Sequence, residues 1–452
     1  MLKYSLQILA IFILSLCSTA CIEDGFDTSA SAQPTFSVDT LDLGTQFTAE
    51  PSATASFVIR NPHSKQLNLS SVRMRLGDDF RINVDGMSGR EFTDVEIRPQ
   101  DSIFVFVECT FAETSAIDPV KMTDYLDVVT NGVTRSLPVV ATAQNAVRHK
   151  AETITADVTF TSKLPHLISD TLRVSRGATL TIEPGATLMF HDKAALIVEG
   201  TLVADATADR PVTLRGDRTG NVVADISYDV MSNQWEGIRF AAESKGNRLS
   251  HTSVVNTCQG VALDSLADLT LINCQITNSG GALLQAIYAD VTAVGTELSN
   301  AADALALLTG GTHVFNRCSL VNFYLFKWPS MAVVELPEPE NTHADFTNCI
   351  LDGRDSLVSD YDNVTEQDIW FRCCLFSVNG TDDERYVGCL WNQDPMLDYS
   401  LTDYTFPYTP LADSPALSAA NPELDLPLLP SADRHGRTRG LTLGAYAPTE
   451  EV

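Results

Sequence analysis

The residues with the clearest potential for chemistry lie in the segment RDSLVSDYDN, which contains Arg354, Asp355, Asp360 and Asp362. Carboxylates in such a group can hold calcium, which acidifies the α-proton of an acidic sugar, and an arginine can then remove that proton. An acidic loop exposed to water explains the same residues without catalysis, and we favour that interpretation. These four residues are therefore candidates for a polysaccharide lyase, without a complete motif.

The sequence indicates no cofactor. Calcium is possible, but no DxDxDG-type loop supports it, and no CxxC pair or Cys/His cluster predicts a zinc site. The histidines are scattered, and none belongs to a nucleophile motif such as GxSxG. We therefore expect no metal and leave catalytic activity unassigned, with an inclination toward a protein that is not an enzyme.

Binding without cleavage is indicated by aromatic residues late in the chain. Aromatic rings can stack against sugars, and the candidates are Tyr324, Trp328, Trp370 and Trp391. Trp328 belongs to an insertion between repeats, and insertions of this kind are frequently working loops. Rows of outward Thr, Asn and Gln would supply hydrogen bonds along an extended ligand.

A repeat that occupies more than half of the chain has to position these residues. Asn256, Asn278, Asn300 and Asn322 recur at 22-residue intervals, each at the end of a similar eight-residue window. A fixed period predicts a solenoid, because each turn presents the same groups to the next. We expect each asparagine to end its strand and to hold neighbouring coils in register.

Each window is predicted to be two short strands joined by a tight turn. The apolar alternation shifts by one residue between Leu271 and Cys274, which a straight strand cannot do. We assign the turn to Asn273, and to Gly295 and Asn348 in other windows, since these residue types tolerate a left-handed backbone. With a third strand between windows, the pattern describes a parallel β-helix of about 22 residues per coil.

Upstream coils carry a pattern that resembles a known superfamily. The runs GATLTIEPGATLMF, LIVEGTLVADATADRPVTL and WEGIRF resemble the opening coils of bacterial right-handed parallel β-helix proteins of the pectate-lyase-like superfamily. The resemblance implies a right-handed β-helix over residues 146–400 and a closing segment over 401–452 that caps the open end of the coil. It specifies fold strongly and activity hardly at all.

The chain departs from the catalytic motifs of this superfamily. Polygalacturonase-like members carry paired carboxylates, a GHG turn and an RxK pair, whereas this chain has Asp382 and Asp383 in the loop NGTDDER and no GHG. We interpret Asp433, His435 and Arg437 as an anchoring network in the closing segment. The expected function is a binding or scaffolding surface for polysaccharide or another cell-surface ligand. The alternative is a polysaccharide lyase or glycoside hydrolase.

Residues 34–145 are predicted to form a separate antiparallel β-sandwich of short alternating strands. The runs LDLG, FVIRNP, IRPQDSIFVFV and YLDVVTNG resemble immunoglobulin-like domains of the abnormal-spindle and Hydin type. Domains of that type space or present other domains and rarely catalyse. The expected fold class is therefore all-β, with a sandwich followed by a β-helix.

The first residues of the chain predict the cellular location of the protein. Residues 1–20 combine Lys3 with a short apolar run and a small residue before Cys21, which is typical of a signal peptide and a lipid-acceptor cysteine. Residues 21–33 are predicted to be a flexible, acidic tether, and acidic residues at this place resemble the surface-export tag of some Gram-negative lipoproteins. We expect a lipid-anchored protein of the outer membrane and cell surface. The alternative is a periplasmic location.

The net charge constrains which partners the protein can bind. A net charge of −28 argues against nucleic acid and anionic headgroups as partners, so membrane contact would rest on acyl chains.

Four cysteines, Cys274, Cys318, Cys349 and Cys374, take the same inward position of the repeat. Parallel side chains at this spacing oppose bridging, so we expect a stack of buried thiols.

Overall fold

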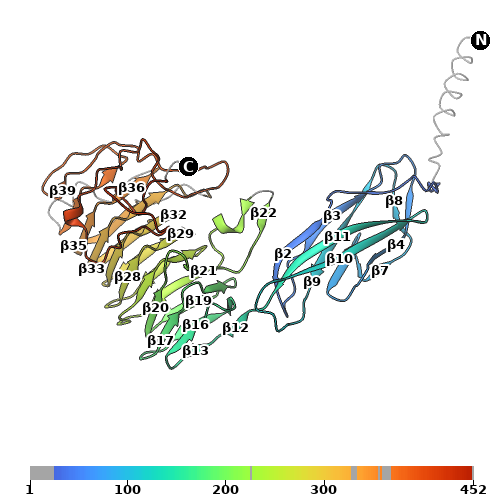
Figure 1. Ribbon diagram of the computed structural model, residues 1–452, viewed down its shortest axis with the longest axis horizontal. Coiled ribbons are helices and arrows are strands. Elements are labelled where there is room, and N and C mark those ends of the chain that lie inside the picture. Colours follow the sequence, from blue (N-terminus) through green and yellow to red (C-terminus); the bar gives the residue numbers. More distant parts are fainter. Residues whose placement is uncertain (1–24, 224–225, 327–332, 355–356, 359–367, 450–452) are drawn as a thin grey trace, which may run out of the picture. The chain divides into compact units, whose positions relative to one another are not determined.

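The computed structural model describes residues 25–223, 226–326, 333–354, 357–358 and 368–449, which divide into two compact units at Asn145 and Ala146. It confirms the expected all-β class, an antiparallel β-sandwich followed by a right-handed parallel β-helix (Figure 1). Cys21 and Trp328 lie outside the described residues, as do Asp355, Asp360 and Asp362.

The first unit packs two sheets against each other around an apolar core. Its strand pairings are antiparallel apart from the parallel pair of β2 and β11, and an isolated parallel bridge joins Phe26 to Gln66. One sheet contains β1 (Thr35–Phe36), β3 (Ala55–Arg60), β9 (Ser102–Cys109), β5 (Phe80–Val84) and β6 (Met87–Gly89). The other contains β2 (Leu41–Phe47), β11 (Val133–Gln144), β10 (Val120–Thr130), β4 (Leu67–Met74), β7 (Glu91–Phe92) and β8 (Val95–Ile97).

The predicted flexible tether is docked on the sandwich from Phe26 onward, which corrects that expectation for this part of it. The amide of Asn131 contacts the carbonyl oxygens of Asp27, Ser29 and Ala32 at 2.9, 2.8 and 3.2 Å. The backbone amide of Asp27 also donates to the carbonyl of Gln66 at 2.8 Å. The composition of the tether is polar, but hydrogen bonds between its backbone and Asn131 and Gln66 order it.

The second unit is a coil whose strands form three parallel ladders. We call the ten-stranded ladder the first sheet. It contains β12 (Val147–Lys150), β15 (His166–Ser169), β18 (Thr187–Phe190), β21 (Val212–Gly216), β26 (Thr252–Val255), β29 (Gln275–Ser279), β32 (Glu297–Ala301), β34 (Ser319–Asn322), β36 (Ile350–Gly353) and β38 (Leu375–Phe376). Partners such as Gln275 and Glu297 lie 22 residues apart, as the period predicts.

The other two ladders merge at a long strand, β33 (Ala306–Asn316). One contains β13 (Thr153–Ile154), β16 (Thr171–Val174), β19 (Ala195–Val198), β24 (Gly237–Phe240), β27 (Val261–Leu263) and β30 (Leu284–Ile287). The other contains β14 (Val158–Phe160), β17 (Thr179–Ile182), β20 (Thr201–Asp205), β25 (Arg248–Ser250), β28 (Asp268–Ile272) and β31 (Asp290–Val294). Beyond them come β35 (Val334–Thr347), β37 (Ile369–Arg372) and β39 (Tyr386–Val387).

The turn predicted inside each window is confirmed. Asn273, Gly295 and Asn348 have φ values of 51°, 57° and 55°, and the equivalent Arg317 has 53°. This left-handed residue reverses the inward and outward sides of the chain between two strands. We call this column of residues, from His251 to Cys373, the turn ladder.

Residues directly after the turn ladder carry a hydrogen-bond donor into the coil. The hydroxyl of Thr252 donates to the carbonyl two residues earlier at 3.0 Å, and the thiols of Cys274, Cys318, Cys349 and Cys374 do the same at 3.3 to 3.5 Å. The expected stack of buried free thiols is confirmed. Both Thr and Cys occur at this position because each is a small donor that fits beside the turn carbonyl.

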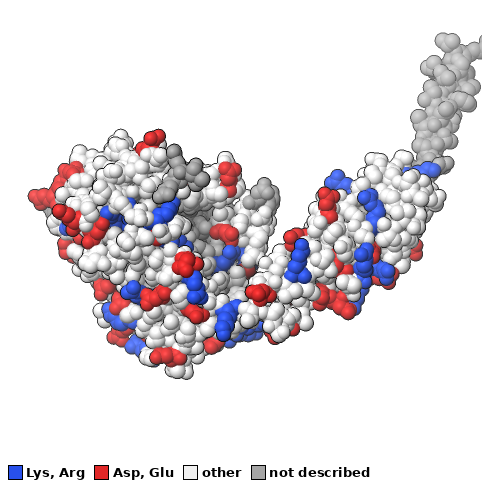
Figure 2. Space-filling model, viewed as in Figure 1, with Lys and Arg blue, Asp and Glu red and all other residues white. Residues whose placement is uncertain are grey.

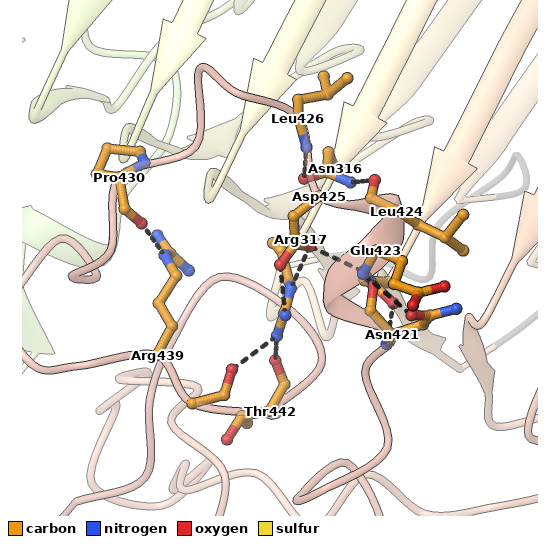
Figure 3. A network of polar contacts seen from close by, with 12 residues as sticks. Asn316, Arg317, Asn421, Glu423, Leu424, Asp425, Leu426, Pro430, Arg439 and Thr442 are labelled. Atoms are coloured by element: carbon orange, nitrogen blue, oxygen red, sulfur yellow. Dashed lines mark hydrogen bonds and ion pairs between the residues drawn. The ribbon is translucent and has the colours of Figure 1, made fainter.

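The closing segment runs back along the coils, beyond the cap predicted at the open end. Figure 3 shows Arg317 of the turn ladder reaching Asp425, to which it donates at 2.7 and 2.8 Å, and the carbonyl of Thr442 at 2.5 Å. Farther back, Arg439 contacts Asn273, and Arg434 contacts Ser253. The turn ladder thus serves as the docking line for the closing segment.

Candidate functional site

The outward face of the first sheet changes character along the coil. One outward row reads Ser253, Gln275, Glu297, Ser319, Ile350 and Leu375, and the other reads Val255, Thr277, Ser299, Val321 and Asp352. The middle coils therefore present polar groups, and the last coils present mostly apolar ones. An apolar outward face requires a cover, and a polar one can meet a ligand.

The closing segment covers the apolar part. Val321, Ile350 and Leu375 pack with Tyr408 and Leu443 in a second, smaller core outside the coil. The cover ends over the middle coils, where Tyr404 and Phe406 are half-buried.

A groove of about 270 Å³ follows at this point, which we call the sheet groove. Its floor spans β21, β26, β29 and β32, a distance of roughly 14 Å at the usual strand spacing. One wall is the 3₁₀ turn Tyr228–Val230 and the other is Tyr404 with Phe406. The lining residues are Thr213, Arg215, Asp229, Val230, Ser253, Val255, Gln275, Thr277, Asn278, Asn300, Tyr404 and Phe406.

The repeated asparagines build the walls of the groove. The amide of Asn256 contacts the carbonyls of Tyr228, Asp229 and Met231 at 2.7 to 3.2 Å, and Asn278 donates to the carbonyl of Asp229 at 3.0 Å. On the opposite side, Asn300 accepts from the hydroxyl of Tyr408 at 2.7 Å.

The expectation that these asparagines keep neighbouring coils in register is therefore confirmed only in part. Asn300 accepts from the backbone of Phe323, and Asn322 accepts from that of Ala301, so these two link neighbouring coils. Asn278 and Asn300 also lie within β29 and β32, which corrects the expectation that each asparagine ends its strand. Their left-handed φ values, 61° and 56°, turn the amide toward the walls of the groove.

A buried carboxyl lies beside the groove under the closing segment. Glu297 is 1% exposed and accepts hydrogen bonds from the hydroxyls of Ser299 and Tyr446 and from the amide of Gln275, which lines the groove. Burial raises the pKa of Glu297 above its usual range, and these donors oppose the shift. The carboxyl thereby fixes the side chain of Gln275 at the groove floor.

Cationic groups lie at one end of the groove. Arg215 pairs with Asp229 at 2.7 Å, which ties the floor to the wall. Arg434 of the closing segment donates to Ser253. The site therefore offers hydroxyls, amides, an arginine and aromatic edges, which are groups suited to hydrogen-bonding a polar, uncharged or weakly acidic chain.

The candidate residues from the sequence lie elsewhere. Arg354 follows β36, whereas the three candidate aspartates are outside the described residues. Tyr324 is 4% exposed and its hydroxyl bonds Ser232 at 2.6 Å, so it has no open ring face. Its predicted role in ligand stacking is therefore corrected to a structural one, because it lies inside the coil surface.

The two candidate tryptophans within the described residues are also held by neighbouring side chains. Trp370 lies in β37, and the guanidinium groups of Arg372 and Arg385 lie 4.8 and 4.3 Å from the centre of its ring. Trp391 stacks on Phe376 with ring centres 4.4 Å apart and donates to Asp382 at 3.0 Å. Asp382 otherwise accepts from the backbone amide of Gly388 beyond β39, and Asp383 from that of Arg385, which are structural roles.

The anchoring network predicted in the closing segment is present. Asp433 is fully buried and accepts from the backbone amides of His435, Arg437 and Ala447 and from the guanidinium of Arg437. Within the described residues, no group of three His, Cys, Asp or Glu side chains could hold a metal ion. No helix in the same part of the chain is long and apolar enough to span a membrane.

Sequence reasoning missed the sheet groove and Asp352. Asp352 lies in the outward row of β36, and burial raises its pKa to about 6. The signal for the groove was the conversion of the outward positions from apolar in the last coils to polar in the middle ones. The period alone does not show which segment covers which coil.

Comparison with known proteins leaves the function open. No family model and no curated protein matches the chain. Similar solved structures include a protein of unknown function from Porphyromonas gingivalis W83, 20% identical over 25% of this chain and 49% of that one, with a TM-score of 0.19. Another is a family 123 glycoside hydrolase from Clostridium perfringens, 10% identical over 27% of this chain and 26% of that one, also with a TM-score of 0.19. The chain spans about half of the first and a quarter of the second.

Proposed function

We propose that this protein is a lipid-anchored surface protein whose β-helix binds a polysaccharide in the sheet groove. The observation that carries the proposal is the groove itself. Gln275, Thr277 and Asn278 offer amide and hydroxyl groups on its floor, and Tyr404 and Phe406 offer rings on its wall. Fixed polar groups beside aromatic rings suit a chain of sugar rings, which present hydroxyls at their edges and apolar faces.

Preorganisation supports the same proposal. Gln275 is held by Glu297, and the two walls are held by Asn256, Asn278 and Asn300. Groups already fixed in the free protein lose little conformational freedom on binding, which favours affinity for a flexible polymer.

We further propose that Cys21 carries the lipid and that the sandwich is an immunoglobulin-like spacer of the abnormal-spindle and Hydin type. Because the chain contacts the sandwich from Phe26 onward, at most about 18 Å of extended backbone would separate Cys21 from the first docked residue. Labelling cells with an alkyne fatty acid should mark the wild-type protein and leave Cys21→Ser unmarked. Protease added to intact cells should distinguish surface from periplasmic exposure.

A glycan array with the soluble chain starting at residue 22 tests the binding proposal. We expect Gln275→Ala/Tyr404→Ala to lose binding, and Thr292→Ala, which changes an outward position of another ladder, to retain it. Failure of every polysaccharide to bind would contradict the proposal. The same reactions are assayed for unsaturated uronide and for new reducing ends, because product formation would favour the lyase or hydrolase alternative.

A further inference from the structure

The sandwich carries two exposed aromatic rings on the outward face of β9. Phe104 and Phe106 are 55% and 38% exposed, while their neighbours Ile103, Val105 and Val107 fill the core. The two rings lie 6.1 Å apart with an angle of 20° between their planes. Their planes are nearly parallel, and together the rings form an exposed apolar platform on a strand in the middle of its sheet.

Polar side chains flank the Phe106 end of this platform. Phe106 lies between Ser56 of β3 and Asn83 of β5 in the strand register, and the amide of Asn83 donates to the hydroxyl oxygen of Ser88 at 3.0 Å. A groove of about 680 Å³ opens here, with Phe106 in its lining. The groove therefore pairs an apolar ring with hydroxyl and amide groups.

The groove is also locally cationic in a chain of net charge −28. Arg81 contacts only the hydroxyl of Thr110, at 3.3 Å, and makes no ion pair among the described residues. Arg90 pairs with Asp78 at 3.1 Å, but both side chains are exposed, so water and salt weaken that pair. Glu108 is the one acid in the lining, and it accepts from Thr54 at 2.6 Å.

From this arrangement we propose a second binding site, on the sandwich, for an acidic polysaccharide. Sugar rings lie on Phe104 and Phe106, and Arg81 donates to a carboxylate of the polymer. Asn83 and Ser88 take up hydroxyl groups. The site is independent of the sheet groove, since its residues all belong to the first unit.

The binding test uses the whole soluble chain from residue 22 with alginate and polygalacturonate oligosaccharides and their carboxyl-reduced, neutral counterparts. We expect Phe106→Ala and Arg81→Gln each to weaken binding of the acidic oligosaccharides at least roughly fivefold. Ile117→Ala and Arg60→Gln are the matched controls, since they remove an exposed apolar and an exposed basic side chain outside the groove. Thermal unfolding should be the same for all four variants.

The outcomes separate the two proposed sites. Loss of acidic binding in Phe106→Ala with retention in Gln275→Ala/Tyr404→Ala supports the sandwich site, whatever the sheet groove binds. Equal affinity for the carboxyl-reduced oligosaccharides, or wild-type affinity in both Phe106→Ala and Arg81→Gln, would overturn it. Binding of a protein strand at this face, with no oligosaccharide bound, would overturn it as well.

Discussion

Tyr446 donates its hydroxyl hydrogen to the carboxyl of Glu297, which joins residues 149 positions apart. Both side chains are buried, and burial raises the pKa of each above its ordinary range. The contact fastens the closing segment next to the sheet groove. The integrity of the groove should therefore depend on the last residues of the chain.

Tyr446→Phe should destabilise the β-helix by about 1–3 kcal/mol, because it leaves a buried carboxyl without one of its donors. Denaturant unfolding monitored by tryptophan fluorescence measures the change. Tyr404→Phe, on the wall of the groove, is the control and should have little effect. Equal stability of Tyr446→Phe and wild type would contradict the importance of this contact.

Asp352 should make stability depend on pH. Burial raises its pKa to about 6, above the value of about 3.9 expected in the unfolded chain, so the folded state holds the proton more tightly. Its contribution is complete below pH ~4 and is lost as pH rises through ~6, by up to about 3 kcal/mol. Asp352→Asn should flatten the unfolding free energy across this window.

The control for that measurement is Asp170→Asn, at an exposed turn with a φ of 67° that asparagine also adopts. It should leave the pH profile unchanged. An identical profile for wild type and Asp352→Asn would show that the Asp352 carboxyl does not titrate in this range.

Arg317→Asn should separate backbone from side-chain effects in the turn ladder. Asparagine accepts the left-handed φ of 53° but cannot reach Asp425, to which Arg317, with 1% of its side chain exposed, makes two hydrogen bonds. We expect a loss of about 3–5 kcal/mol and faster proteolysis of the closing segment. Arg176→Ala, which breaks the exposed pair with Glu243, should cost under about 1 kcal/mol.

The hydrogen-bond donor after each turn should contribute to stability. Threonine and valine have the same shape, so a comparison of the two at this position isolates the contribution of the donor. Cys318→Thr places a hydroxyl where Thr252 and Thr296 already donate to the turn carbonyl. Cys318→Val removes the donor, so it should be less stable than Cys318→Thr by about 0.5–1.5 kcal/mol. A valine variant as stable as the threonine variant would mean that this position only fills space.

Charge on the coil surface is distributed in small groups of both signs. Figure 2 shows acidic and basic side chains interspersed over the face of the β-helix that it draws. Pairs such as Arg239 with Asp264 and Arg248 with Asp205 account for part of this pattern. A net charge of −28 therefore does not by itself identify a binding face, and local sets such as Arg81 with Arg90 are more informative.

The sequence by itself determined the period, the turns and the thiol stack. Asn273, Gly295 and Asn348 were identifiable because few residue types adopt a left-handed backbone, and the buried cysteines because they recur at one inward position. It also indicated the sandwich, whose strands alternate strictly, as in β9. These properties are local, so neighbouring residues suffice to specify them.

Only the tertiary structure decided where ligands can reach the coil. Tyr446 and Asp425 contact Glu297 and Arg317, which lie more than 100 positions earlier in the chain. Nothing in the local sequence around Tyr446 or Asp425 predicts these contacts. Tyr324, which the sequence offered as a ligand contact, is buried and hydrogen-bonded to Ser232, 92 positions earlier, whereas Gln275 and Thr277 line a groove. Function on a repetitive surface depends on what covers each coil, and covering is a contact between distant parts of the chain.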